Sequence, residues 1–558
     1  MLIDQFRENE NWVKGLMKMP HFAQNTFDLL LASAFINILS LALPLTLMQV
    51  YDRIIPHESM GTLTWLTIGC TTAVILEAVL RLSRSFISGW MAARFEHIVS
   101  CSAVERLMTS RIEQFEQFET GVHLDRLNAI STLRGFYAGQ VFQVLLDLPF
   151  ALIFLFAIWF LAGNLVFFPI ILMILFLGIV SYFKTNFQAA RDNQMVVNDR
   201  RFNFIIEILS GIHAIKSMHM EEQILRRYAR LQGQSAEINM ETSRWSMLPA
   251  NVGVLFSQIT MYGIIGIGAG SVLDGFMTVG SLTACMMLGG RAMQPIQSAA
   301  GFWMRFSEAN LARSRLQELA AMELETMPDT PPLPLDFEGA IELKGVSFRY
   351  DPQSAWVVKD AHLKVEPNHI IAVMGENSGT TTTLLYLLMG MLKPETGSVL
   401  IDDYHITQWD TTELRQKIAY FPPTGVLFSG TIMENITMFD HSKHFAAMDA
   451  AALLGLDEHV ANLPLGYQTR VGGQSTNFLP TGLIQRIAIA RALVHRPRIL
   501  LFDRANGVMD KETEEVVLDL IKKLTGKCTI VLVTNQPKLL MMVDGVYQLA
   551  GDTLESLY

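Results

Sequence analysis

The sequence predicts a multidomain membrane protein, in which an all-α transmembrane domain of about six helices precedes an α/β domain of the P-loop type. Three observations predict this fold class. Half of the 558 residues are hydrophobic, and the long apolar runs gather before about residue 300. Basic residues flank these runs in a regular alternation. The last third alternates short apolar strands with helical stretches, which is typical of a largely parallel sheet.

Six apolar stretches approach the length of about 20 helical residues that is needed to cross a bilayer. They are residues 28–50, 62–82, 141–162, 165–183, 247–273 and 277–296. Residues 1–27 lack the continuous apolar core of a secretory signal peptide, so we expect them to form a short cytoplasmic lead-in.

The distribution of basic residues orients these spans. The connections at 83–140 and 184–246 are rich in Lys and Arg, whereas the turns at 163–164 and 274–275 carry none. The positive-inside rule therefore places both termini and the two long connections in the cytoplasm. Because the connections are too long for simple loops, we expect helical extensions that fold back. Their tips either touch a cytoplasmic domain or belong to self-contained solvated hairpins.

A proline-rich linker at 327–337 separates the transmembrane domain at 28–326 from the soluble domain at 338–558. In the soluble domain we expect buried strands and one prominent helix. The strands are predicted at 341–350, 370–374, 498–502 and 529–533, and the helix at 484–494.

The strand at 370–374 runs into a loop that resembles a P-loop, in which backbone N–H groups and a helix N-terminus bind phosphates. The loop consists of Gly375, Glu376, Asn377, Ser378, Gly379, Thr380, Thr381, Thr382 and Thr383. Thr380 stands at the position of the second glycine and Thr381 at that of the lysine, while Thr382 keeps the hydroxyl of the magnesium ligand. A threonine cannot supply the positive charge with which lysine meets the β- and γ-phosphates.

Motifs along nearly the whole chain resemble those of ABC exporters, and most closely the permease/ATPase proteins of bacterial type I secretion systems. Those in the first part are MQVYDRIIP (48–56), LDLPF (146–150), EILSGIHAIK (207–216) and GRAMQP (290–295). Those in the soluble part are VSFRY (346–350), LFSGTIMEN (427–435) and QRIAIARAL (485–493). The resemblance implies an ABC nucleotide-binding domain with ATP and Mg²⁺ as cofactors, located at the bacterial inner membrane.

The resemblance also assigns roles by position, and several positions keep the expected residue. Tyr350 retains the adenine-stacking position, Asp503 the Walker B aspartate that helps Thr382 to hold magnesium, and Asp510 the D-loop aspartate. The signature loop, expected as LSGGQ, reads LPTGL at 479–483, so that Gly482 is the one polar-contact position that survives.

Four other positions depart from the family. Pro423 replaces the glutamine that senses magnesium, Arg504 the Walker B glutamate, Asn535 the switch histidine and Gly473 the glutamate before the signature. Removing one such group typically slows turnover by about two or three orders of magnitude, and such losses are not additive. We therefore predict that this chain has no catalytic residue of its own. Arg504 either contacts phosphate or folds away.

The alternatives for the nucleotide site are weak binding without turnover, an essentially empty site, or substitutions that compensate one another so that hydrolysis survives. A homodimer would carry two defective sites, so the resemblance implies a heterodimer with an intact half-transporter. It also implies a periplasmic adaptor, an outer-membrane channel and a protein or peptide substrate. Because about 27 residues precede the first span, we expect no N-terminal peptidase domain. The alternative function is a pseudo-transporter that acts as a membrane scaffold or regulator.

Charge excludes one partner class and marks two further residues. A net charge of −10 without a basic stripe indicates no nucleic-acid partner, whereas membrane lipid surrounds the apolar spans. Asp147 and Arg291 fall within predicted spans, where charge is costly, so each is either a functional residue or a satisfied structural feature. The spacing of Cys and His residues indicates no metal-ligand set.

Overall fold

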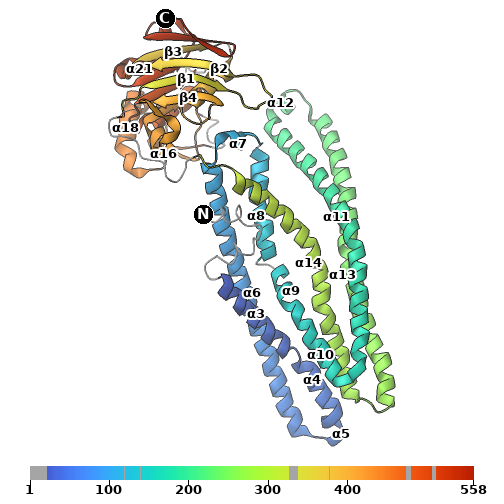
Figure 1. Ribbon diagram of the computed structural model, residues 1–558. Helices are drawn as coiled ribbons and strands as arrows, with labels where there is room; N and C mark the ends of the chain where they lie inside the picture. The colour runs from blue at the N-terminus through green and yellow to red at the C-terminus, as the bar shows by residue number, and fades with distance from the viewer. Residues whose placement is uncertain are drawn as a thin grey trace. The chain divides into compact units, whose positions relative to one another are not determined.

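The computed structural model describes residues 22–118, 120–137, 140–325, 337–375, 377–472, 479–504 and 511–557 (Figure 1). The chain divides into two compact units. The helical unit comprises Met1–Met108 and Phe118–Met322, and the sheet unit comprises Thr109–Gln117 and Glu323–Tyr558. Residues 327–336 of the predicted linker at 327–337 and the first 21 residues lie outside the described residues.

The helical unit consists of long helices joined by short turns, as the apolar pattern predicts. Its helices are α3 (Phe22–Leu39), α4 (Ala42–Gln49), α5 (Ile55–His57), α6 (Met60–Thr109), α8 (Thr120–Tyr137), α9 (Gln140–Asp147), α10 (Ala151–Ala162), α11 (Phe167–Ser210), α12 (Ile212–Ser217), α13 (Glu221–Leu273) and α14 (Val279–Ala321). Helix α13 has 53 residues. At 1.5 Å per residue it is about 80 Å long, which is more than twice the thickness of a hydrocarbon core. The predicted helical extensions beyond the spans are therefore present.

Four stretches of the described chain are long and apolar enough to cross a membrane. They are Gln24–His57, Met60–Thr109, Leu148–Ser210 and Glu221–Leu273. The third contains two expected passes, because α10 and α11 meet at Gly163, whose φ of +55° suits glycine. The expected last pass, 277–296, lies in the first part of α14, which is not among the four. The count of six passes stays a prediction.

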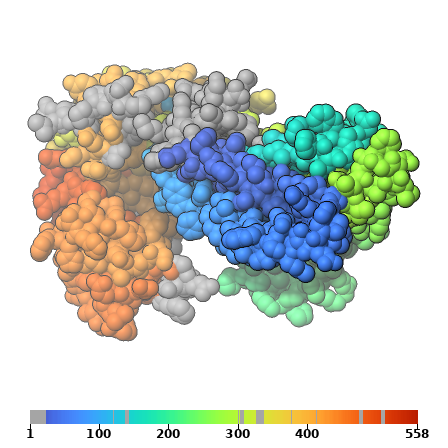
Figure 2. All heavy atoms as spheres, turned by 90° about the horizontal axis from the view of Figure 1, so that it is seen from below, coloured from blue at the N-terminus to red at the C-terminus, as the bar shows by residue number. Residues whose placement is uncertain are grey.

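The N-terminal helices present an apolar surface, and Figure 2 shows α3 to α6 as adjoining blue spheres. The most apolar window of α6 has no buried residue, and large side chains such as Trp65, Leu82 and Phe86 are exposed. An apolar surface of this extent is unfavourable in water and suits a lipid environment.

The chain makes a π-helical turn at Val50–Ile54, within the first membrane motif. This turn places the Asp52 carboxylate at the start of α14, where Oδ1 accepts the Gly280 N–H at 2.8 Å and Oδ2 accepts the Thr278 hydroxyl at 2.5 Å. A Cβ on Gly280 would lie 2.4 Å from the Met48 carbonyl oxygen, so glycine allows the close approach. The carboxylate thus satisfies donors that a helix N-terminus leaves open.

The sheet unit contains two larger sheets, one mostly parallel and one antiparallel. Its strands are β1 (Ile341–Phe348), β2 (Val358–Val365), β3 (Ile370–Gly375), β4 (Thr396–Ile401), β5 (Tyr404–His405), β6 (Ile418–Phe421), β7 (Gly430–Thr431), β8 (Arg470–Val471), β9 (Ile499–Asp503), β10 (Thr529–Val533), β11 (Gly545–Ala550) and β12 (Thr553–Ser556). The six-stranded sheet has the order β12-β11-β3-β10-β9-β6, parallel except for β12. The second sheet has the order β2-β1-β4-β5 and is antiparallel. These strands confirm the predicted α/β fold class.

Helices cover the parallel sheet on both faces. The helices of this unit are α15 (Ser378–Leu388), α16 (Thr411–Lys417), α17 (Ile432–Thr437), α18 (His444–Leu453), α19 (Leu456–Ala461), α20 (Thr481–Leu493), α21 (Lys511–Leu524) and α22 (Pro537–Leu540). Of these, α17, α18 and α19 contact α20. Alternate residues of β10 join different cores: Val531 and Val533 pack with α15, whereas Ile530 and Leu532 pack with α20. Since successive side chains of a strand point to opposite faces, both faces of β10 are buried.

One segment from the first long connection belongs to the sheet unit. In α7 (Ile112–Glu116), Ile112 packs against the core that contains α15, and Glu113 Oε1 accepts the backbone N–H of Lys393 at 2.7 Å. The backbone N–H of Glu325 donates to the Thr109 carbonyl at 2.9 Å. This bond joins the segment Thr109–Gln117 to the beginning of the segment Glu323–Tyr558 within the sheet unit. The tip of this connection therefore contacts the soluble domain, as one of the two expectations had it.

Candidate nucleotide site

The loop between β3 and α15 has the local geometry of an anion-binding turn. Asn377 precedes α15, and its side-chain oxygen accepts the Gly379 N–H at 3.0 Å. This Asn cap fixes the first turn and leaves neighbouring N–H groups at the positive end of the helix dipole. Glu376 lies outside the described residues, and the side chain of Ser378 is not among those described.

The threonines that follow are held mostly by the loop itself. Thr381, at the lysine position, is completely buried, and a Cβ on Gly375 would lie 2.6 Å from its methyl carbon. Thr380 is also buried, so neither side chain presents a long polar group to a ligand. Thr383 donates its hydroxyl to the Gly379 carbonyl at 2.8 Å. The loop keeps its shape but has no cation of its own.

Tyr350 lies beside this helix, after β1. Its ring is half exposed, and its hydroxyl is 2.9 Å from the Thr383 hydroxyl. Partial burial raises the pKa of Tyr350, so the phenol stays protonated at neutral pH. The exposed ring next to α15 suits a stacking contact with a base.

Asp503, at the end of β9, is the most deeply buried acid of the site. Its Oδ2 accepts the Thr382 hydroxyl at 2.7 Å and the Tyr420 hydroxyl at 2.9 Å. Burial, together with the negative charge of Asp503, raises the pKa of Tyr420 far above its usual range, so the phenol donates as a neutral group.

The other carboxylate oxygen of Asp503, Oδ1, is buried and has no hydrogen-bond partner among the described residues. A buried carboxylate oxygen without a partner is unfavourable. Oxygen donors of this kind suit a hard cation such as Mg²⁺, so Asp503 and Thr382 fit the expected metal.

Arg504 turns back onto the loop. Its backbone has a φ of +48°, and its N–H donates to the Val533 carbonyl at 3.1 Å on the neighbouring strand. From this turn the guanidinium Nη2 donates to the Gly375 carbonyl at 3.0 Å. The residue at the glutamate position therefore brings a positive charge to the first residue of the P-loop.

Two of the remaining sequence-predicted residues lie at the same edge of the parallel sheet as the P-loop and Asp503, because they follow strands that run parallel to β3 and β9. Asn535 follows β10 and is exposed. Pro480 precedes α20 without a side-chain cap, while Gly482 and Leu483 are buried, and Leu483 packs in the core. Pro423 follows β6. The D-loop aspartate Asp510 and Gly473 lie outside the described residues.

Sequence reasoning missed Tyr420, which shares the carboxylate of Asp503. The sequence gave no sign of this contact, because the pairing of β6 with β9 brings the two residues together only in the fold. It also missed Arg486, the largest fully buried side chain, which donates to Thr513 Oγ1 and Glu512 Oε1 at 3.0 Å each.

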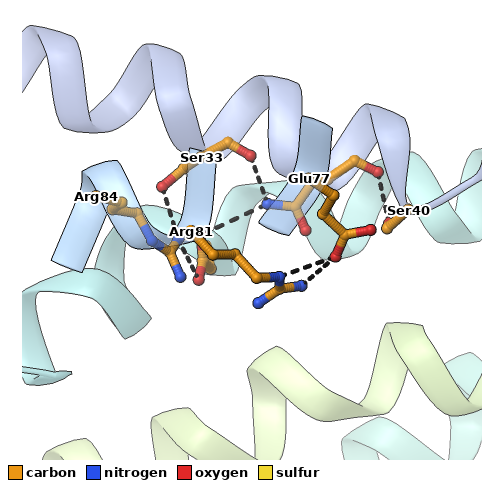
Figure 3. A network of polar contacts seen from close by, with 7 residues as sticks. Ser33, Ser40, Glu77, Arg81 and Arg84 are labelled. Carbon is orange, nitrogen blue, oxygen red and sulfur yellow. Dashed lines mark hydrogen bonds and ion pairs between the residues drawn. The ribbon is translucent and has the colours of Figure 1, made fainter. Parts of the chain in front are cut away.

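In the helical unit, Asp147 forms a structural ion pair (Figure 3). Arg84 Nη1 lies 2.8 Å from Asp147 Oδ1 and also donates to the Ser33 hydroxyl at 3.0 Å. Asn37 Nδ2 reaches Asp147 Oδ1 at 3.5 Å. Because charge is costly at membrane depth, this pairing favours the structural interpretation of Asp147. Arg291 lines a neighbouring cavity of about 90 Å³ and has no ion pair among the described residues.

Removing Arg84 should destabilise the helical unit, because it leaves a largely buried carboxylate without its cation. We expect Arg84→Ala to cost about 3 kcal/mol and to lower the midpoint of thermal unfolding in detergent. Arg81→Ala is the matched control, since Arg81 is half exposed and pairs with Glu77 one turn away. Such surface pairs contribute about 0–1 kcal/mol. Equal destabilisation by both variants would contradict a structural role for the Arg84–Asp147 pair.

A larger cavity of about 850 Å³ lies among α8, α11, α13 and α14. Much of its lining is polar or charged, including Arg134, Arg191, Gln194, Ser246, Gln297 and Glu308. Arg191 pairs with Glu308 at 2.6 Å. A polar cavity in a helical unit with apolar outer surfaces offers a wet environment between the helices.

Comparison with known proteins agrees with the geometry of both units. Residues 27–295 match the family described as ABC transporter transmembrane region, and residues 358–506 match the family described as ABC transporter. A structure titled as a bacterial Atm1-family ABC exporter with ATP bound superimposes with a TM-score of 0.83 at 20% identity, over 95% of this chain and 94% of the other. That similarity shows the fold.

Curated relatives are similar over most of the chain. The cyclolysin secretion/processing ATP-binding protein CyaB of Bordetella pertussis is 28% identical over 97% of this chain and 75% of its own length. The alpha-hemolysin translocation ATP-binding protein HlyB of Escherichia coli O157:H7 is 28% identical over 91% of this chain and 72% of its own length. The chain is therefore an ABC exporter half-transporter, a multi-pass protein of the bacterial inner membrane that resembles toxin-secretion ATPases and carries an ABC ATPase domain, which implies binding of ATP and Mg²⁺.

Proposed function

We propose that this chain is the non-hydrolysing subunit of a heterodimeric exporter that secretes a protein or peptide. The observation that carries the proposal is the placement of Arg504. A guanidinium stands where the glutamate that polarises water is expected, and it is hydrogen-bonded to Gly375 rather than poised to accept a proton. An arginine cannot act as a general base, because its guanidinium carries five N–H donors and no acceptor for a proton.

Each residue of the site can still contribute to binding. Tyr350 would stack on the base, the α15 N-terminus would meet the phosphates, and Thr382 with Asp503 would hold the ion. When bound, Mg²⁺ neutralises charge on the phosphates. Thr381 supplies no charge, and Asn535 cannot take the proton that a histidine would. These losses together leave a site that binds nucleotide without turning it over.

The heterodimer follows from how ABC sites are built from two chains. In this family each site pairs the Walker motifs of one chain with the signature loop of the other. At the site built on this chain's Walker motifs, an intact partner would supply a working signature loop. At the second site, the partner would supply the catalytic Walker motifs. That second site would face the LPTGL loop of this chain, so we expect slow or conditional turnover in the complex.

The relatives support a role in secretion. They are named for secretion or translocation of toxins, and their similarity extends over both units of this chain. A periplasmic adaptor and an outer-membrane channel would complete a path out of a Gram-negative cell. The polar cavity of about 850 Å³ supports transport over a purely scaffolding role, since a scaffold needs no wet space between its helices.

Co-purification tests the proposal. The chain is tagged, extracted gently from its native membrane, and its partners are identified by mass spectrometry. We expect a second half-transporter with an intact Gly-Lys-Ser/Thr loop and Walker B glutamate, and ATP hydrolysis only when that partner is present. A stable complex that contains this chain without such a partner would reject the heterodimer. A scaffold or regulator, which does not change substrate export when deleted, would then be the better description.

A further inference from the structure

The P-loop of this chain lacks a positive charge in sequence as well as in structure. Residues 375–383 read GENSGTTTT, which contains no Lys or Arg and includes an acid. Four negative charges on a nucleoside triphosphate are unfavourable in a loop without a counter-charge. A site that binds nucleotide therefore needs a cation from elsewhere in the fold.

Arg504 is positioned to supply that cation. Its left-handed backbone is unfavourable for a residue other than glycine. The N–H bond to the Val533 carbonyl holds this turn against the sheet. From this turn at the end of β9, the side chain reaches the carbonyl of Gly375 at the end of β3, on the far side of the intervening strand β10.

The guanidinium retains donors for a ligand. It carries five N–H groups, and among the described residues its side chain makes one hydrogen bond, from Nη2 to the Gly375 carbonyl. Arg504 is only partly buried, so its other donors can be reached by a ligand. Arg504 also lies near the N-terminus of α15, whose dipole is positive. Two positive groups placed together favour an anion between them.

The buried oxygen of the adjacent residue is a second, independent sign of a ligand. Asp503 Oδ1 is buried without a hydrogen-bond partner in the described structure, which a bound cation would relieve. The site therefore offers an oxygen donor for a metal ion and, one residue further, a guanidinium for phosphate. Together the carboxylate oxygen and the guanidinium suit a phosphate ligand that carries a metal ion.

We infer that Arg504 is the phosphate-binding cation of this site, contacting the terminal phosphates of a nucleotide in place of the missing P-loop lysine. The inference rests on the proposed function, in which this site binds without hydrolysing. Planar guanidinium groups bind phosphate oxygens in pairs, which a threonine cannot do. One substitution thus removes the catalytic glutamate and supplies a group that retains the nucleotide.

Photolabelling of the complex tests this role chain by chain. The tagged complex is labelled with 8-azido-ATP, and labelling of this chain is measured separately from that of any partner. We expect Arg504→Gln to weaken labelling by about tenfold to a hundredfold, and Arg504→Lys to restore part of it. In Arg504→Gln, the concentration of ATP that halves the labelling should rise by the same factor. The concentration of AMP that halves it should change little, because AMP lacks the terminal phosphates.

The chain offers a closely matched control. Arg496 has a φ of +50°, close to that of Arg504, but its side chain is 83% exposed and lies 3.7 Å from Asp449. Arg496→Gln should leave labelling within about twofold, and both variants should keep the unfolding midpoint of the parent. Loss of labelling in Arg496→Gln would point to a general effect of removing charge and would overturn the inference.

The outcomes separate this inference from the proposed function. Undiminished labelling in Arg504→Gln overturns the inference while leaving the non-hydrolysing role intact. The absence of any labelling of the parent chain overturns it as well, because the site would then be empty. Hydrolysis by the parent chain at its own site would reject the proposed function, even if Arg504→Gln still weakened binding.

Discussion

Replacing the Walker B glutamate of the partner half-transporter by glutamine should abolish ATP hydrolysis by the complex, because this chain has no group to take over. We expect a fall of at least about two to three orders of magnitude, measured as phosphate release from the purified complex. In a symmetrical exporter the same change in one subunit would leave a second competent site. In this chain, Arg504 stands at the position of that second glutamate.

The control is a substitution in this chain, at the position where the family has the switch histidine. Asn535 replaces the expected histidine and is exposed, so Asn535→Ala should alter turnover by less than about twofold. Export of the substrate should follow hydrolysis in both variants. Residual hydrolysis after loss of the partner's glutamate would mean that this chain turns over ATP, and would contradict the proposal.

Restoring the signature loop should accelerate the complex, because the partner's intact Walker site faces that loop. Pro480 has neither a hydroxyl nor an N–H, and it precedes α20 without a side-chain cap. Pro480→Ser with Thr481→Gly should therefore raise turnover by at least about tenfold. The serine would also cap α20, which typically stabilises a helix by about 1 kcal/mol. Turnover is measured in the complex with an otherwise unchanged partner.

The third position of the loop requires a separate variant. The family pattern suggests Leu483→Gln, but Leu483 is buried and packs in the core beneath α20. A glutamine there would bury an amide without an evident partner, at a cost of about 1–3 kcal/mol. We expect this single variant to lower the unfolding midpoint without raising turnover. Unchanged turnover in the Pro480 and Thr481 double variant would mean that the partner works by another arrangement.

The sequence was sufficient for the fold class and for the elements that carry the nucleotide site. The strands at 370–374 and 529–533 appear within a residue of their predicted positions, because continuous apolar runs are typical of strands buried on both faces. The helix predicted at 484–494 also forms, as the greater part of α20.

Three features of the sites depended on the fold. The contact of Tyr420 with Asp503 arises from strand order, which local sequence does not encode. The direction of Arg504 depends on a left-handed backbone that a residue other than glycine rarely adopts. The partner of Asp147 is Arg84, 63 residues earlier, and helical spacing relates only residues three or four positions apart.

The small segment around α7 alters how the sheet unit is tethered. Because Thr109–Gln117 belongs to that unit, the chain passes between the units after residue 108, after residue 117 and after residue 322. A body attached by one strand of polypeptide can swivel freely, whereas one attached at three points resists rotation. Any rearrangement of the sheet unit would therefore pull on α6 and α8 as well as on the end of α14. A fragment that starts after the linker would also lack Ile112 and Glu113, and would expose the apolar surface that they cover.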